Sequence, residues 1–500
     1  MKKDTTLLRD TKRLVLLIII GLLSLSGCAT EQLSRAPLTP VTSWTESPPS
    51  SITSVRDYSV QYNSQVAEPY HVPNINEAHA YQLSELIDMA QMNNPDTHIA
   101  WQQARQAALA VGMTEATFLP MISASVIGGY QKNHTKLPYD QHINTSYNAL
   151  ISGVGFQWLL FDFGQRRALI DVAENNSFAA NIAFNGMHQK LIYDVTRAYF
   201  MYGAALSRVD IAQKSLQNSQ RILDAAQARR RSGIATTVEV AQATQQVAQS
   251  RLNLVLSQGA ERDAWQALVG AMGISPTSHF TVSYSYKKAL PDMYSMPTQS
   301  MIKRALSQRP DVLASFAAVQ AANSGIKAVE ADFLPKIYMA GAVSSGDGRF
   351  DVQGLPSLGS QSSSSNILIG VSVPLYDGGI RDARVKEAES RASASNEVFK
   401  KTQNSAVREI VVAASALRSA LESNKAALNL VSTATITYDA ALDSYRNGVG
   451  TVTLVNEANN NLLFAQQLSS DSYASARIAA ANLAFVMGEM SQTTHDVDLQ

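Results

Sequence analysis

The chain has 500 residues, with 41 Lys and Arg balanced by 41 Asp and Glu, and it contains one cysteine. This charge balance argues against a nucleic-acid-binding protein, which would carry a basic face. A single cysteine excludes a disulfide framework within the chain and a cysteine-based metal site.

Residues 1–27 have the pattern of a bacterial lipoprotein signal peptide. Basic residues precede an apolar run from Leu14 to Leu25, which is shorter than the ~20 residues that a membrane-spanning helix needs. Small residues then lead directly to Cys28, which predicts that Cys28 is lipidated and becomes the new N-terminus. An ordinary signal peptide with an incidental cysteine is the alternative. Ala29 stands where an Asp would signal retention in the inner membrane, so delivery to the outer membrane is favoured.

Residues 28–78 are rich in Ser, Thr and Pro over most of their length, with little helical or strand patterning. We interpret this stretch as an extended, lipid-anchored N-terminal segment between the lipid and the body of the protein.

The rest of the chain is a tandem duplication with an offset of 215 residues. Phe-Leu-Pro occurs at 118–120 and again at 333–335, and Asp-x-Gly-x-Arg occurs at 162–166 and 377–381. Chance does not supply so many matches at one offset without a gap. The predicted divisions are a first copy at 79–270, a connector at 271–298, a second copy at 299–488 and a tail at 489–500.

The first copy begins with helical patterning over 79–117 and breaks at Phe-Leu-Pro, because proline cannot continue a helix and holds the preceding residue extended. Alternating apolar residues then predict strands at about 121–131 and 150–160, separated by a polar, turn-rich stretch over 131–146.

The second copy repeats this order, with a helix over 299–332 and strands at about 336–344 and 366–375. Strands of about ten residues with one apolar face and one small or polar face suit the wall of a membrane β-barrel. A soluble sandwich would show the same alternation, so the strands alone leave both open.

A helical run without proline follows each strand pair, over 164–230 and 379–445. Each run covers roughly 67 residues, or about 100 Å, and its dilute, alanine-rich apolar content suits a wall of packed helices rather than a globular core. The runs end at Gly233 and Gly448, and a return helix of about half the length follows each. One long helix can therefore lie beside two short ones stacked end to end.

The order of these elements, given twice, resembles the outer-membrane factor family of TolC-like tunnel proteins. With an N-terminal lipid, the chain is more similar to efflux members of the OprM type than to unlipidated TolC. The expected fold is mainly α with a small membrane β part. The resemblance implies a homotrimer whose twelve strands form one barrel in the outer membrane, continued by an α-helical barrel in the periplasm. It also implies two partners, a periplasmic adaptor and an inner-membrane pump that is proton-driven or of the ABC type.

The duplicated motifs supply the predicted site residues. The junction between the two barrels is assigned to Phe118, Pro120, Asp162 and Gly164, and to Phe333, Pro335, Asp377 and Gly379. The resemblance implies that the glycine turns dock the adaptor, through Ser232, Gly233, Ile234, Asn447, Gly448 and Val449. It also implies a periplasmic gate of Tyr445, Glu239 and Glu457. Two positions depart from TolC, because Gly450 replaces a linking arginine and Leu454 replaces an acidic residue.

An enzyme is not indicated by any pattern in the chain. HExxH, GxSxG, Walker and dinucleotide-binding motifs are absent from the sequence, and the eight histidines have no ligand spacing. We therefore expect neither a cofactor nor a metal site.

The predicted function is the exit duct of a tripartite efflux pump, anchored by lipid in the outer membrane and projecting into the periplasm. The outer-membrane component of a type I protein secretion system is the alternative. A lipid-anchored coiled-coil spacer without a pore is a more remote one, because a spacer has no use for two amphipathic strand pairs.

Overall fold

The computed structural model describes residues 66, 75–138, 141–284 and 289–490. The chain divides into two compact units, Met1–Tyr70 and His71–Gln500, and the fold below is that of the second unit. Cys28, the signal peptide and most of the segment 28–78 lie outside the described residues, as does nearly all of the tail, so their assignments stay predictions.

Each copy opens with two helices rather than the single predicted helix. In the first copy, α2 (Leu83–Asn93) ends just before α3 (Pro95–Glu115) begins. Asn94 between them is extended, with φ −72° and ψ 125°, because the residue before a proline is disfavoured in helical geometry. The prediction of one continuous helix over 79–117 was therefore wrong at Asn94.

The second copy is broken in the same way between α6 (Gln299–Gln308) and α7 (Pro310–Glu330). The residue before the proline reaches the end of a return helix in both copies. The Asn94 amide donates to the Ala271 carbonyl at 3.1 Å, and Arg309 Nη1 donates to the Val486 carbonyl at 3.0 Å. The break in each copy therefore lies at the end of the return helix, α5 in the first copy and α9 in the second.

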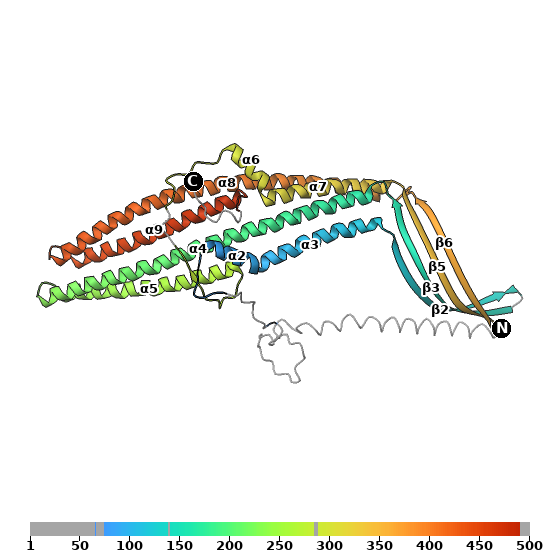
Figure 1. Ribbon diagram of the computed structural model, residues 1–500, viewed down its shortest axis with the longest axis horizontal. Coiled ribbons are helices and arrows are strands. Elements are labelled where there is room, and N and C mark those ends of the chain that lie inside the picture. The colour runs from blue at the N-terminus through green and yellow to red at the C-terminus, as the bar shows by residue number, and fades with distance from the viewer. Residues whose placement is uncertain (1–65, 67–74, 139–140, 285–288, 491–500) are drawn as a thin grey trace, which may run out of the picture. The chain divides into compact units, whose positions relative to one another are not determined.

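Four antiparallel strands form one sheet in the order β2–β3–β5–β6 (Figure 1). The strands are β2 (Met121–Leu137), β3 (Gln141–Phe161), β5 (Lys336–Val352) and β6 (Leu358–Ser372). The first three are longer than predicted, and β6 starts earlier and ends before residue 375. Most of the stretch 131–146, predicted as turn-rich, is paired strand, because backbone hydrogen bonding continues through polar residues to the pair Leu137 and Gln141.

The strand register places the predicted apolar residues on one face of the sheet. Ile122 pairs with Phe156, and Trp158 pairs with Met339, which pairs with Ile369. The opposite face carries mostly small and polar residues, such as Ser123, Gly155, Ala342 and Asn366. Leu160 was predicted to share the apolar face, but a β-bulge between Leu159 and Phe161 interrupts its pairing with β5.

The two long helices, α4 (Gln165–Arg231) and α8 (Ile380–Arg446), have 67 residues each, as predicted. The return helices are α5 (Thr237–Met272) and α9 (Val452–Val486). They begin at Thr236 and Thr451, whose hydroxyls accept hydrogen bonds from backbone N–H groups of the first turn at 3.2 and 3.3 Å.

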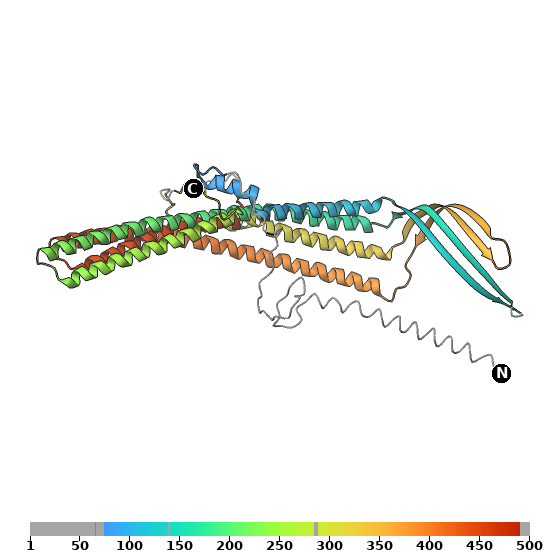
Figure 2. The ribbon, with the colours of Figure 1, turned by 90° about the horizontal axis from the view of Figure 1, so that it is seen from below.

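Six helices form two layers within the single chain, one near the sheet and one at the far end, and α4 and α8 run through both (Figures 1 and 2). Near the sheet, neighbouring helices contact in the order α3, α4, α7, α8; at the far end the order is α5, α4, α9, α8. Helix α8 therefore lies at one edge of both layers, with α3 and α5 at the other edge. The stretch Pro310–Phe333 is apolar and long enough to cross a membrane by composition, but it lies in the first layer, between α4 and α8.

A small parallel pair of strands, β1 (Ala80–Tyr81) and β4 (Thr281–Val282), holds the connector beside α4. Tyr284, two residues after the end of β4, packs over Gly203 of α4. The Tyr199 hydroxyl of α4 donates to the Ser283 carbonyl at 2.6 Å. A Cβ at Gly203 would lie 2.0 Å from the Tyr284 ring. Gly203, one of the two glycines inside α4, therefore leaves the space in which the connector residue Tyr284 packs.

We predict that Gly203→Ala lowers the apparent melting temperature of the purified protein. The added methyl group forces the Tyr284 ring to move, and overpacking of this kind costs about 1–3 kcal/mol. Gly270→Ala is the matched control, because no atom lies within 4 Å of a Cβ at Gly270 in α5. Far-UV circular dichroism melts measure both variants, and equal melting temperatures would contradict the packing role.

Candidate functional site

The chain passes from the sheet into α4 through a buried Asp–Arg pair. Asp162 Oδ2 accepts hydrogen bonds from the backbone N–H of Arg166 at 3.0 Å and from its Nε at 2.8 Å. Asp162 Oδ1 accepts from the backbone N–H of Gly164 at 3.3 Å, and both paired side chains are 6% exposed. Asp162 thereby caps the first turn of α4, where the helix dipole favours a negative charge. Gly164 supplies the left-handed backbone, with φ 98°.

Arg166 joins the remaining parts of this junction. Its Nη1 donates to the Thr117 carbonyl at 2.9 Å, and its Nη2 donates to the carbonyl of the bulged Leu160 at 3.4 Å. The guanidinium lies over the Phe118 ring at 4.2 Å, a cation–π contact. Phe118 therefore serves as the platform for the arginine. Arg166 and Arg381 match at the duplication offset, and that signal could have identified their role.

The second copy has the same junction, but its Asp–Arg pair is more exposed to solvent. Asp377 Oδ2 accepts from Arg381 Nε at 2.7 Å, and Arg381 lies over the Phe333 ring at 5.0 Å. Gly379 has φ 88°. The Asp377 side chain is 28% exposed, and its hydrogen bond from Arg381 holds the pKa of the carboxyl below its usual range.

The Phe-Leu-Pro motifs change the backbone from helix to strand. The short 3-10 helices η4 (Ala116–Phe118) and η6 (Ala331–Phe333) come first, and then Leu119 and Leu334 turn to extended geometry, with ψ 153° and 155°. Pro120 and Pro335 then stand directly before β2 and β5. The structure therefore brings all eight predicted junction residues to the two places where helices meet the sheet.

The predicted docking turns lie at the other end of the helices (Figure 1). Gly233 and Gly448 have φ 76° and 88°, the left-handed geometry that lets a helix stop within one residue. Ile234 and Val449 next to them are 64% and 85% exposed. Ser232 and Asn447 are the C-caps of α4 and α8. Each turn thus presents an apolar side chain at its tip.

Tyr445 is fully buried, three residues before the second of these turns. Its hydroxyl donates to Glu239 Oε2 of the neighbouring turn at 3.5 Å, a long and weak hydrogen bond. Burial, and then the charge of Glu239, raise the pKa of Tyr445, so the hydroxyl stays protonated and remains a donor at neutral pH. Glu239 Oε1 accepts from the Thr236 N–H at 3.3 Å and so completes the cap of α5.

Arg229 also contacts Tyr445, and no sequence pattern identified it. Its Nη1 donates to the Tyr445 carbonyl at 2.5 Å, and its guanidinium lies 4.7 Å from the centroid of the tyrosine ring. These contacts join the end of α4 to the end of α8. Arg229 has no arginine counterpart at the duplication offset, where Ser444 stands, so the repeat gave no signal for it.

The two departures from TolC have different structural settings. A Cβ at Gly450 would lie 2.9 Å from the Tyr445 nitrogen and 3.1 Å from the Ser444 carbonyl carbon, so this turn does not accept a side chain there. Leu454 is 49% exposed on the first turn of α9. Glu457, the third predicted gate residue, is exposed on α9.

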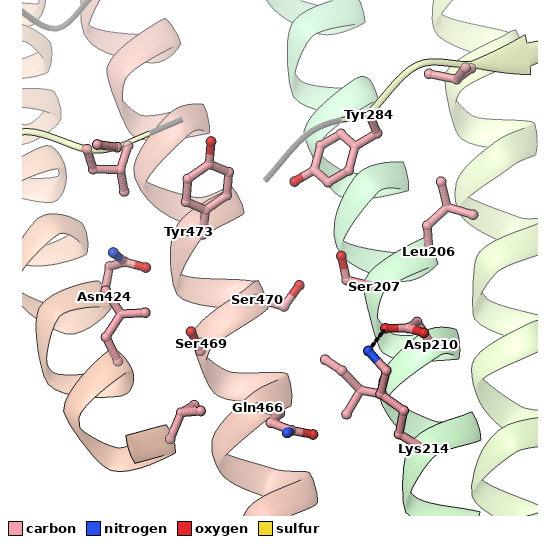
Figure 3. A pocket seen from close by; sticks show the side chains of 16 residues that line it. Leu206, Ser207, Asp210, Lys214, Tyr284, Asn424, Gln466, Ser469, Ser470 and Tyr473 are labelled. Carbon is pink, nitrogen blue, oxygen red and sulfur yellow. Dashed lines mark hydrogen bonds and ion pairs between the residues drawn. The ribbon is translucent and has the colours of Figure 1, made fainter. Parts of the chain in front are cut away.

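A pocket of 680 Å³ lies between α4, α8, α9 and the connector (Figure 3). The charged side chains that line it, Asp210 and Lys214, pair with each other at 2.6 Å. Tyr284 and Tyr473 line it as well, and none of the predicted site residues does. With its two charges already paired, this pocket offers less for ligand binding than the two ends of the helices do.

The comparison with family models decides the assignment. The model of the family described as outer membrane efflux protein matches residues 86–274 and 301–489, once in each copy. The chain belongs to this family. The outer membrane efflux protein family consists of transport channels rather than enzymes, so this chain is an outer-membrane efflux channel.

Known proteins agree with this family over most of the chain. Protein CyaE of Bordetella pertussis is 23% identical, over 83% of this chain and 86% of that protein. The cation efflux system protein CusC of Escherichia coli strain CFT073 is 24% identical, over 78% and 82%. The crystal structure of the CmeC outer membrane channel of Campylobacter jejuni has a TM-score of 0.71 at 19% identity, over 83% and 87%. The predicted fold class, family and outer-membrane location are confirmed.

We predict that Asp162→Ala destabilises the folded protein more than Asp377→Ala does. The first change leaves Arg166 buried without its partner, which costs about 3–5 kcal/mol when a buried pair is broken. Asp377→Ala is the matched control, because the same junction is rebuilt there around a more exposed carboxylate. Guanidinium unfolding followed by tryptophan fluorescence measures both variants. Equal shifts of the midpoint would show that burial does not set the strength of the junction.

Proposed function

We propose that three copies of this chain form one continuous tunnel, the exit duct of a tripartite efflux pump. One observation carries the proposal: the sheet has four strands, and its edge strands β2 and β6 each have an unpaired side. A small closed barrel needs about eight strands, and an open sheet edge is not tolerated in lipid. Pairing β6 of one copy with β2 of the next gives twelve strands and closes the barrel.

The helices support the same closure. Helix α8 lies at one edge of both helical layers, and the other edge is α3 near the sheet and α5 beyond it. Apolar side chains are exposed along these edge helices, including Leu109 (65%) and Met113 (67%) of α3 and Leu256 (62%) of α5. Ile436 of α8 is 66% exposed. Contact between α8 of one copy and α3 and α5 of the next would bury them and close a helical barrel beneath the strands.

The two faces of the sheet suit a membrane wall. The apolar face carries Ile122, Val154 and Ile367, all exposed in the single chain, and it ends near Asp347 and Arg349. Facing it outward places an apolar band against lipid and leaves the small and polar face toward the lumen. A lipid on Cys28 would add a second attachment to the same membrane, and this assignment stays a prediction.

The tripartite assignment implies two protein partners. The glycine turns are proposed to meet a periplasmic adaptor, and the adaptor to join an inner-membrane pump. Type I secretion is the alternative, and the genes that neighbour this one distinguish the two. A proton-driven pump beside it would support efflux, and an ABC exporter would support secretion.

We further propose that Tyr445, Glu239 and Arg229 hold the periplasmic end closed. The Tyr445–Glu239 hydrogen bond is long, and bonds of this kind contribute about 1 kcal/mol or less. Three copies of this bond supply only a few kcal/mol, in addition to the Arg229 contacts with Tyr445. Glu457, exposed on α9, is proposed to lie at the lumen entrance.

We predict that Tyr445→Phe raises single-channel conductance in planar bilayers, because it removes the hydroxyl and keeps the ring that Arg229 covers. Tyr438→Phe is the matched control, since the buried Tyr438 hydroxyl has no hydrogen-bond partner among the described residues. Glu239→Ala is a less clean test, because it also removes the cap of α5. Unchanged conductance in Tyr445→Phe would leave the tunnel and remove this gate. Absence of an SDS-resistant oligomer in the unmodified protein would contradict the proposed trimer.

We predict that Gly448→Trp abolishes transport while the trimer and its level in the membrane are kept. The new side chain would cover the tip of the turn, where the adaptor is proposed to dock. Gly354→Trp is the matched control, because Gly354 has the same φ of 88° in the turn after β5. A tryptophan at Gly354 introduces the same backbone strain and side-chain size away from the docking turn, and it should not block transport. Drug susceptibility of a deletion strain carrying each variant measures transport. Full resistance with Gly448→Trp would place the docking surface elsewhere.

A further inference from the structure

The antiparallel register brings two histidines together at the far end of the sheet. His134 of β2 lies opposite Asn144 of β3, and His142 lies two residues before Asn144 in β3. Both imidazoles therefore project from one face of the sheet. Their ring centroids are 5.1 Å apart, with the ring planes at 20°. Both side chains are exposed. Seven residues separate them in sequence, and only the hairpin makes them neighbours.

A chain of hydrogen bonds fixes which nitrogen His134 presents. The Asn144 side-chain amide donates through Nδ2 to Gln353 Oε1 at 2.7 Å, and the Gln353 backbone N–H donates to the Asn144 carbonyl at 2.9 Å. This arrangement turns Asn144 Oδ1 toward His134 Nδ1, with which it forms a hydrogen bond. Because Oδ1 is an acceptor, Nδ1 carries the proton and Nε2 holds a free lone pair.

We propose that His134 and His142 form a binding site for a divalent transition-metal ion of the zinc type. A histidine that ligates a metal through one nitrogen usually donates its other N–H to a carbonyl or carboxylate, as His134 does to Asn144. With metal–nitrogen bonds of about 2.0–2.1 Å in tetrahedral geometry, two imidazoles on one ion hold their centroids roughly 5 Å apart. The observed centroid separation of 5.1 Å meets that value, and rotation of the stacked His142 ring would turn one of its nitrogens toward the same ion.

The donor atoms and the local charge select the class of ion. The pair offers imidazole nitrogens, which suit Zn²⁺, Cu²⁺ and Ni²⁺, whereas Ca²⁺ and Mg²⁺ require oxygen ligands. Lys136 lies directly opposite His142 in the register, and its positive charge opposes any cation at the pair, so binding must come from the imidazole–metal bonds. Water molecules would complete the coordination. A bound ion would cross-link β2 to β3 at the end of the hairpin. The inference rests on the hairpin geometry and not on the channel function.

Isothermal titration of the full-length, EDTA-treated protein with zinc chloride at pH 7.5 tests the site. We expect one ion per chain, and a loss of at least tenfold in affinity in His134→Asn and in His142→Asn. Asn144→Ala should weaken binding by about 10–100-fold, because it removes the group that orients His134. His98→Asn, an exposed histidine of α3, is the matched control and should bind zinc like the unmodified chain.

Copper titration followed by electron paramagnetic resonance gives an independent measurement. Nitrogen splitting from two imidazoles is expected in the unmodified chain and from one imidazole in His142→Asn. Oligomer migration in SDS verifies that each variant is folded. The site is refuted if the unmodified chain takes up no zinc, or if the His134→Asn, His142→Asn double variant binds it with the same affinity and stoichiometry.

Discussion

The unpaired backbone groups of a sheet edge dominate the organisation of this protein. In water, an edge strand can be hydrated, but in the hydrocarbon region every N–H and C=O must find a partner within protein. A four-stranded sheet with two free edges therefore leaves backbone groups without partners in a membrane. The long helices carry the same incompleteness into the periplasm, because α8 lies at one edge of both helical layers and α3 and α5 lie at the other. Sheet and helices are thus incomplete along the same two sides of the chain.

The junction between sheet and helices reconciles two kinds of backbone pairing. A strand takes its hydrogen bonds from its neighbours, whereas a helix takes them from itself, so the residues between them lose partners of both kinds. Asp162 and Asp377 satisfy the free N–H groups of the first helical turn, and Arg166 and Arg381 satisfy carbonyls of the segments that arrive there. At the second position of the Asp-x-Gly-x-Arg motif, the second copy has Gly378 where the first copy has Phe163, a non-glycine residue with φ 52°. The first junction therefore carries backbone strain that the second avoids, and it has the more deeply buried ion pair.

Much of the fold could be predicted from the sequence, because the pattern is given twice. Duplication made the long helices, the glycine turns and the Phe-Leu-Pro breaks visible, and each is a local property of the backbone. The breaks at Asn94 and Arg309 were missed, although the proline after each is a local signal too. Strand ends were missed for another reason: polar residues in 131–146 pair through their backbones, which composition does not reveal. The role of Arg229 depends on a contact between distant segments, and that of the His134–His142 pair depends on the register of one hairpin, so local spacing indicates neither.

The C-terminal ends of α4 and α8 have the same backbone geometry but different side chains. Arg229, Arg230 and Arg231 precede the first turn, whereas Tyr445 and Arg446 precede the second. In the proposed trimer, six turns of near-equal shape would alternate around the opening in two chemical kinds. A partner ring built from six identical subunits would then occupy two unequal sets of contacts, three of each. Both sets would reach the buried tyrosines, the second turn through Tyr445 itself and the first turn through Arg229 and Glu239.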